Sequence, residues 1–196
     1  MRKRIAVILF AVAVIAVVAS VLIVAALNGH KSTTQRSTSS STTQQGVSGG
    51  SGPYITRTQA SSLLGSGVNY TVTQYEGLSI ATYFPPYARN STSAWIASYR
   101  ASSGAALTET LYNSTNAGTM YSVLYEYNAP NMTATGRSGS MEYAYGLKNS
   151  GGKNAQTLFL FGHEGDYMAV IQAYAAENSS ALNVTAFVET AAADMS

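Results

Sequence analysis

The 196-residue chain has no cysteine, only two histidines and one tryptophan, and charged residues make up 10% of it. Without cysteine the chain cannot form disulfides, a thiolate nucleophile or a cysteine-ligated metal site. A blue-copper site needs two histidines, a cysteine and usually a methionine. That class of electron carrier is therefore excluded as well, since His163 is the only histidine after residue 53.

Positive charge is scarce in most of the chain, although the formal net charge is +2. Five basic residues come before residue 54, namely Arg2, Lys3, Arg4, Lys31 and Arg36. From Tyr54 onward six basic residues stand against nine acidic ones, which leaves a net charge of −3. A mildly acidic domain without a basic patch does not fit nucleic-acid binding, so no nucleic-acid partner is expected.

Residues 5–27 form one long apolar stretch of Ala, Val, Ile, Leu and Phe with a single Ser. As a helix it would be about 35 Å long, enough to cross a hydrocarbon core of roughly 30 Å. The basic residues 2–4 predict a cytoplasmic tip at residues 1–4 and export of everything after the span. Because a cleaved signal has an apolar region of only roughly 7–15 residues, we predict a retained transmembrane signal anchor. Cleavage after the small residues Val24 and Ala26 is the alternative.

Residues 28–53 separate this anchor from the rest of the chain. Twelve of these 26 residues are Ser or Thr, and Val47 is the only sizeable apolar side chain. Such a composition buries too little surface to offset the entropy of ordering, so we predict a disordered Ser/Thr/Gly-rich tether. As a flexible coil it would hold the following domain about 28 Å from the anchor.

Residues 54–196 have the length of one domain, and their first part alternates between helix and strand signals. Thr56 followed by Gln59 predicts a short helix with a capping box that ends near Gly65. Alternating apolar and polar residues then predict strands, the first two joined as a hairpin at Glu76 and Gly77. These predicted strands cover residues 68–75, 78–84, 95–100, 106–112 and 120–127.

The remainder of the domain predicts a helix from residue 128 toward 145, then a hairpin of strands 158–161 and 168–174. A closing amphipathic helix is predicted over residues 181–195, capped by a serine at 179 or 180. The fold class is therefore predicted to be α+β. It comprises an antiparallel sheet with a short N-terminal helix and a closing C-terminal helix, preceded by one transmembrane helix.

Asparagine glycosylation motifs are the most frequent signal in the domain. Six asparagines stand in the pattern Asn-x-Ser/Thr, namely Asn69, Asn90, Asn113, Asn131, Asn178 and Asn183. In a region this rich in Ser and Thr, chance alone would give about two or three. We therefore expect an exported glycoprotein, with a purely compositional origin of the motifs as the alternative. Glycosylated positions would have to be exposed.

Few residues of the domain are candidates for metal binding or catalysis. His163, Glu164 and Asp166 are a compact group of potential metal ligands, but a polar turn explains them better, because no second cluster accompanies them. A hydrolase has little support, since Ser138 lacks a complete Gly-x-Ser-x-Gly motif. A carboxylate pair for glycoside cleavage could come from Glu109, Glu126 and Glu142, although solvated strand positions explain these better. No catalytic residue, metal or cofactor is predicted.

Tyrosines offer a candidate binding face. In the predicted strand 120–127, Tyr121, Tyr125 and Tyr127 would share one side, and Tyr143 and Tyr145 could extend it. Aromatic side chains of this kind serve well at interfaces with proteins or glycans. The alternative is the half-buried face of an ordinary sheet.

The chain begins with a basic tip, a long apolar helix and a Ser/Thr-rich stalk, and a cysteine-free domain with many glycosylation motifs follows. This order resembles uncharacterised membrane-anchored surface glycoproteins of archaea. The resemblance covers residues 1–53 and implies an anchored surface glycoprotein. A pilin-like subunit would share the N-terminal helix, but Arg4-Ile5-Ala6 differs from the basic-then-Gly/Ala junction at which such precursors are cut. The first hypothesis is a non-enzymatic single-pass surface protein that binds an extracellular protein or glycan. A pilin-like or envelope structural subunit is the second hypothesis, and an extracytoplasmic hydrolase is the third.

Overall fold

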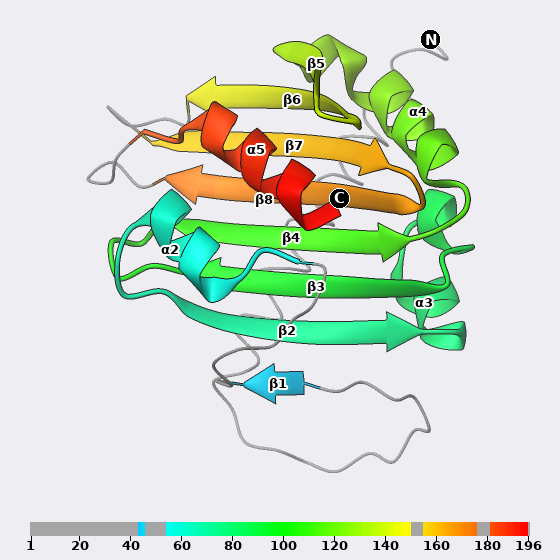
Figure 1. The fold of residues 1–196 in the computed structure, drawn as a ribbon, viewed down its shortest axis with the longest axis horizontal. Coiled ribbons are helices and arrows are strands. Elements are labelled where there is room, and N and C mark those ends of the chain that lie inside the picture. Colours follow the sequence, from blue (N-terminus) through cyan, green and yellow to red (C-terminus); the bar gives the residue numbers. More distant parts are fainter. Residues whose placement is uncertain (1–42, 46–53, 150–154, 176–180, 196) are drawn as a thin grey trace, which may run out of the picture. The chain divides into compact units, whose positions relative to one another are not determined.

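The computed structural model describes residues 43–45, 54–149, 155–175 and 181–195 (Figure 1). The predicted cytoplasmic tip and transmembrane anchor lie outside these ranges, as does the tether except for three residues. Within the described ranges, no helix has both the length and the apolar character needed to cross a membrane.

The domain is built on one antiparallel sheet, which confirms the predicted α+β class. Seven strands lie side by side in the order β2-β3-β4-β8-β7-β6-β5, and the three-residue β1 (Thr43–Gln45) pairs with the outer edge of β2. The strand bounds are β2 Asn69–Glu76, β3 Ser93–Arg100, β4 Ala106–Asn113, β5 Ala134–Ser138, β6 Met141–Asn149, β7 Gln156–Glu164 and β8 Tyr167–Ala175. The predicted strands 68–75, 95–100 and 106–112 and the hairpin of 158–161 with 168–174 are confirmed.

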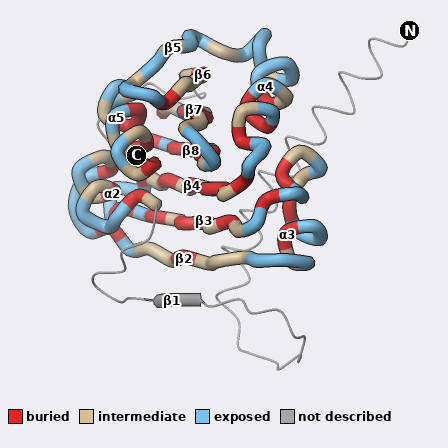
Figure 2. Tube along the Cα trace, turned by 45° about the vertical axis from the view of Figure 1, so that its right-hand side comes forward, coloured by how far each residue is buried: buried red, intermediate tan, exposed pale blue. Residues whose placement is uncertain are grey.

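Helices lie on both faces of the sheet. Figure 2 shows α2 and α5 on one side of the strands and α3 and α4 on the other. The helix bounds are α2 Arg57–Leu64, α3 Leu78–Tyr83, α4 Ala117–Asn128 and α5 Val184–Met195. Short 3-10 turns, η1 Pro86–Ala88 and η2 Ala129–Asn131, follow α3 and α4.

The two helices predicted at the ends of the domain are confirmed. Thr56 caps α2 through a complete capping box, in which its hydroxyl accepts from the Gln59 backbone N–H and the Gln59 side chain accepts from the Thr56 N–H. The closing helix α5 begins at Val184, and Asn183 Oδ1 accepts from the Ala186 N–H at 3.3 Å. Asn183 therefore takes the capping position expected of a serine at 179 or 180, which lie outside the described residues.

The strand predicted over residues 78–84 is wrong, because this segment forms helix α3. Alternation over so few residues fits either element, and tertiary burial decides between them. Ile80 and Phe84, four residues apart, are both buried, and the Phe84 ring packs edge-on against Tyr75 and Tyr112 at centroid distances of 5.1 and 5.5 Å. A strand would have placed Leu78 beside them, whereas in the helix it is 88% exposed.

The strand predicted over residues 120–127 is also wrong, and so is the helix predicted to follow it. Ala117, Met120 and Leu124 have helical spacing and are buried in α4, and this pattern overrides the alternating tyrosines. Residues 134–149 form the hairpin of β5 and β6 instead of a helix. The glycines that weaken a helix suit this hairpin, since Gly139 takes a positive φ of 60° at its turn.

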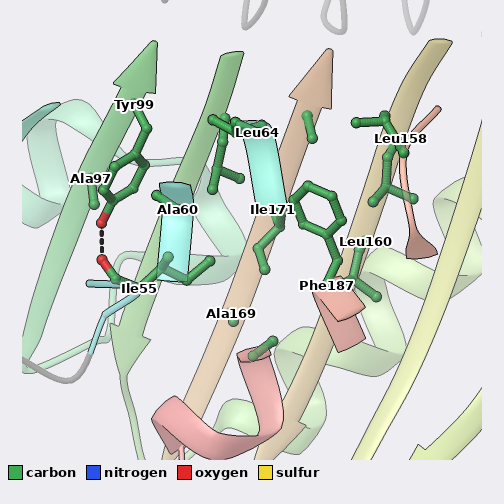
Figure 3. Close-up of a cluster of buried hydrophobic side chains, with 14 of the residues drawn as sticks. Ile55, Ala60, Leu64, Ala97, Tyr99, Leu158, Leu160, Ala169, Ile171 and Phe187 are labelled. Carbon is green, nitrogen blue, oxygen red and sulfur yellow. Dashed lines mark hydrogen bonds between the residues drawn. The ribbon is translucent and has the colours of Figure 1, made fainter. Parts of the chain in front are cut away.

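Two apolar cores result, one on each face. The core beneath α2 and α5 includes Ile55, Leu64, Leu160, Ile171 and Phe187 (Figure 3). The core beneath α3 and α4 is smaller and includes Ile80, Phe84, Met120, Phe161 and Met168. The sheet is therefore a shared wall between two cores, and its side chains alternate between them.

Phe187 links α5 to the first of these cores and is fully buried. We expect Phe187→Ala to lower the free energy of unfolding by about 3–5 kcal/mol, because it leaves a large cavity. Leu78→Ala is the control and should change it by less than about 0.5 kcal/mol, since Leu78 is exposed. Chemical denaturation followed through the fluorescence of Trp95, which packs against this core, measures both values. Similar effects of the two substitutions would contradict this account of α5.

Candidate functional site

The sheet face that carries α3 and α4 consists of four cross-strand rows of side chains, and the helices cover two of them. The first covered row contains Tyr75, Ala94, Tyr112, Met168, His163, Glu142 and Arg137. The second contains Thr73, Ile96, Thr110, Val170, Phe161, Ala144 and Thr135. Most of these side chains belong to the α3/α4 core or pack against it.

The other two rows extend beyond the helices for most of their length. The third row ends in Phe159, which packs against the α3/α4 core, and the buried Gly146. We use the term open face for Thr71, Ser98, Thr108 and Gln172 of the third row and Asn69, Arg100, Ala106, Tyr174, Thr157 and Lys148 of the fourth. Each of these residues is half-buried or exposed, and none belongs to either core. Turn η2 marks the border at β6, where a Cβ on Gly146 would lie 2.5 Å from the Asn131 carbonyl oxygen.

Hydroxyl, amide and basic groups dominate the open face. The Ser98 and Thr108 hydroxyl oxygens lie 3.5 Å apart across β3 and β4, and the Tyr174 side chain is 41% exposed beside them on β8. In the fourth row, which we call the outer row, Lys148 carries positive charge at one end and Arg100 carries it next to Asn69 at the other. None of the described acidic residues belongs to this face, although the domain as a whole is acidic.

The predicted tyrosine face does not form one row, because its residues lie on helix α4. Tyr121 is only 7% exposed and stacks on Tyr125, with 6.3 Å between ring centroids. Tyr127 is six residues from Tyr121, which places it about 120° away around the helix. Tyr143 and Tyr145 pack against the α2/α5 core on the opposite face. Binding by Tyr121, Tyr125 or Tyr127 stays a prediction.

The polar cluster of His163, Glu164 and Asp166 is split by the β7–β8 hairpin. His163 points toward α4, with its Nε2 3.7 Å from Glu142 Oε2 and its ring 5.0 Å from that of Tyr121. Burial, followed by the nearby Glu142 and Tyr125, raises the pKa of Tyr121 to about 12. Glu164 is on the other face, where it accepts a hydrogen bond from the Ser140 hydroxyl. In the described part of the chain, no three His, Cys, Asp or Glu side chains converge on a potential metal position.

The residues considered for hydrolysis are likewise separated. Glu109 and Glu142 lie on opposite faces of the sheet, and Glu126 is exposed on α4. Ser138 and His163 also belong to opposite faces, as their positions in the strand registers show. The arrangement of described residues therefore brings together neither a carboxylate pair nor Ser138 with His163.

Glu109 is not the solvated strand residue predicted from the sequence. It lies in the α2/α5 core with 1% exposure, and its Oε2 accepts from the Ile55 backbone N–H at 2.7 Å. The Tyr99 hydroxyl donates to the carbonyl of the same Ile55 (Figure 3). On α5, Asp194 Oδ1 accepts from the Gln59 amide at 2.8 Å. Glu109 Oε1 and Asp194 Oδ2 are buried without a hydrogen-bond partner in the described structure.

Burial changes the protonation of this cluster. Removal from water raises the pKa of Glu109 from 4.5 to about 8, the Ile55 N–H opposes the rise, and the charge of Asp194 adds to it. Burial also raises the pKa of Asp194, opposed by its hydrogen bond from Gln59. The neutral form of Glu109 is therefore favoured at pH 7. The pattern of Leu107, Glu109 and Leu111 on one side of β4 was the signal for its burial.

The glycosylation motifs border the open face without occupying its centre. Asn69, Asn90, Asn131 and Asn183 are exposed, Asn113 is half-buried at the end of β4, and Asn178 lies outside the described residues. Asn69 pairs in register with Arg100 at one edge, and Asn131 Oδ1 accepts from Lys148 Nζ at 3.2 Å at the other. The strands β4, β8 and β7 between them present no described glycosylation motif on this face. Attachment of glycans at these motifs stays a prediction.

The open face is an uncovered polar surface that the strand registers define on the described domain. It lies on rigid central strands, and its side chains point the same way because they alternate with core residues. Comparisons with protein-family models, with curated proteins and with solved structures find no match to this chain. Its functional interpretation therefore depends on the geometry.

Glu109 generates a prediction about pH. Below about pH 4.5 its carboxyl is neutral in both the folded and unfolded states. Above that, the unfolded chain releases the proton and the folded domain keeps it up to about pH 8, so stability falls as pH rises through this window. We expect the free energy of unfolding to fall by up to about 4 kcal/mol between pH 5 and 8.

Glu109→Gln, which imitates the neutral acid, should remove most of this decline. The exposed Glu189→Gln on α5 is the matched control and should keep it. Denaturant titrations at a series of pH values, again followed through Trp95, compare the three proteins. A wild-type slope that persists in Glu109→Gln would show that another group causes it.

Proposed function

We propose that this protein is a single-pass membrane-anchored surface glycoprotein whose domain 54–196 is a non-enzymatic binding module outside the cell. The observation that carries the binding role is the open face. On this side of the sheet the helices cover two rows of side chains and leave most of the other two half-buried or exposed. A helix could have covered these rows, so their polar composition suits contact with another molecule.

The rigidity of the open face supports this role. Its central strands β3, β4, β8 and β7 each pair with neighbours on both sides, and a second core lies directly beneath them. The backbone of such a platform is already ordered before binding, so no contact energy is consumed by ordering a loop. The glycosylation motifs at the edges would leave this centre accessible.

The membrane anchor rests on residues 5–27, whose length and preceding basic residues favour a retained span with the domain outside. The surface location explains the six glycosylation motifs, because Asn-linked glycans occur on exported protein. A domain held by a tether of about 28 Å would be free to meet partners near the membrane. We keep the pilin-like subunit as the outcome to be tested against this proposal.

Intact-mass spectrometry of protein purified from native membranes tests the anchor and the sugars together. We expect a mass that includes residues 1–27 plus several hexose-scale increments. Asn69→Gln, Asn90→Gln, Asn131→Gln and Asn183→Gln should each remove an increment, because these asparagines are exposed. Asn149→Gln, an exposed asparagine outside any motif, is the control and should remove none.

Other masses would contradict the proposal in different ways. A chain that begins within residues 5–27 and keeps most of the apolar helix would favour the filament subunit. A start near residue 27 would mean a secreted domain without an anchor. A full-length mass without sugar increments would support the membrane anchor and contradict the proposal that the protein is glycosylated.

A further inference from the structure

The outer row of the open face points to a ligand class. We infer that this face binds an extended acidic glycan, such as a chain of uronate sugars, along the line from Arg100 to Lys148. The inference rests on the proposed binding role of the open face and adds the chemistry of its ligand.

Charge complementarity is the first argument. The eight described acidic residues lie in the other core, on the helices, at the strand ends or on the covered rows of the sheet. Arg100 and Lys148 are both exposed on the open face and have no acidic neighbour on it. On a domain whose net charge is −3, the open face is thus the side that would attract an anion.

Geometry supports an extended ligand. Arg100 on β3 and Lys148 on β6 are four strand spacings apart, which amounts to about 19 Å. Ala106, Tyr174 and Thr157 lie between them in the same row. A single small anion could reach only one of the two basic groups, whereas a linear polymer could contact both and pass over the tyrosine.

The remaining side chains suit sugars. Tyr174 offers an exposed aromatic face with a polar tip, which can pack against a sugar ring and bond its hydroxyls. Ser98, Thr108 and Gln172 form a parallel row about 6.8 Å away, and their hydroxyl and amide groups both donate and accept hydrogen bonds. Groups of this kind match neutral sugar hydroxyls, while the two basic groups match the carboxylates.

An acidic polypeptide fits this face less well. Peptides commonly bind a sheet by adding a strand at an edge, where backbone N–H and C=O groups are unpaired. The centre of the open face lies over β3, β4, β8 and β7, whose backbones are paired on both sides. Two basic groups are also too few to hold a nucleic acid against physiological salt.

The test uses the full-length protein in lipid nanodiscs and three fluorescent polymers: polygalacturonate, neutral dextran and polyglutamate. We expect polygalacturonate to bind more tightly than the other two, and its binding to weaken as salt is raised. The double substitution Arg100→Gln with Lys148→Gln should weaken it about tenfold or more. Tyr174→Ala should weaken it several-fold and reduce the salt dependence little, because it removes a stacking contact and no charge.

Arg137→Gln is the matched control. Arg137 is also exposed, but it lies on one of the two covered rows of the same sheet face, 3.8 Å from Glu142. Its loss should leave binding unchanged, and Trp95 fluorescence confirms that each variant is folded. If Arg137→Gln weakens polygalacturonate binding as much as the double substitution does, the binding site is not the open face. If dextran or polyglutamate binds as tightly as polygalacturonate, the ligand is not an acidic glycan. If none of the polymers binds, the inference is wrong. The proposal of an anchored, exported glycoprotein is tested separately, by the intact mass of the protein.

Discussion

The pairing of β4 with β8 is the constraint on which the rest of this domain depends. It joins residues about 60 positions apart at the centre of the sheet, in eight register pairs from Ala106 with Tyr174 to Asn113 with Tyr167. The strands on either side are joined mainly by local hairpins, which form without such a loop-closure cost. Once β4 and β8 meet, α2 from the first half and α5 from the second come to the same face. Their shared core then closes around Phe187.

The buried carboxyl groups show what this closure requires. Glu109 sits on β4 beneath the join of α2 and α5, where it accepts from the Ile55 N–H. Asp194 on α5 is bonded to Gln59 of α2, so the two helices and the central strand are linked through polar groups inside an apolar core. The desolvation free energy of an ionised Glu109 exceeds the stabilisation from its single hydrogen bond with the Ile55 N–H. Burial therefore favours the neutral form of Glu109. We therefore expect the stability of the α2/α5 core to depend on pH.

Local signals in the sequence predicted the parts of the fold that depend on neighbouring residues. The Thr56–Gln59 capping box, the β3–β4 and β7–β8 hairpins and α5 follow from spacing and turn residues alone. Prediction failed where one segment carried two periodicities, as in α4, whose tyrosines alternate while Ala117, Met120 and Leu124 follow a helix. The open face could not be predicted, because it depends on which rows α3 and α4 leave uncovered. Glu109 was missed because acidic residues are usually solvated, although Leu107 and Leu111 on the same side of β4 indicated a buried position.

The two faces of the sheet differ in how much apolar surface they bury. The α2/α5 core extends across the sheet from β2 to β6 and supplies the larger share of apolar burial, so the opposite face does not have to be fully covered for the fold to be stable. The half that α3 and α4 leave open is free to carry Ser98, Thr108, Gln172 and Tyr174 without a folding penalty. The acidic side chains that the structure describes all lie elsewhere on the domain, whereas Arg100 and Lys148 lie on the open face. A surface that is rigid, polar and opposite in charge to its own domain favours an external anionic partner over further packing within the chain.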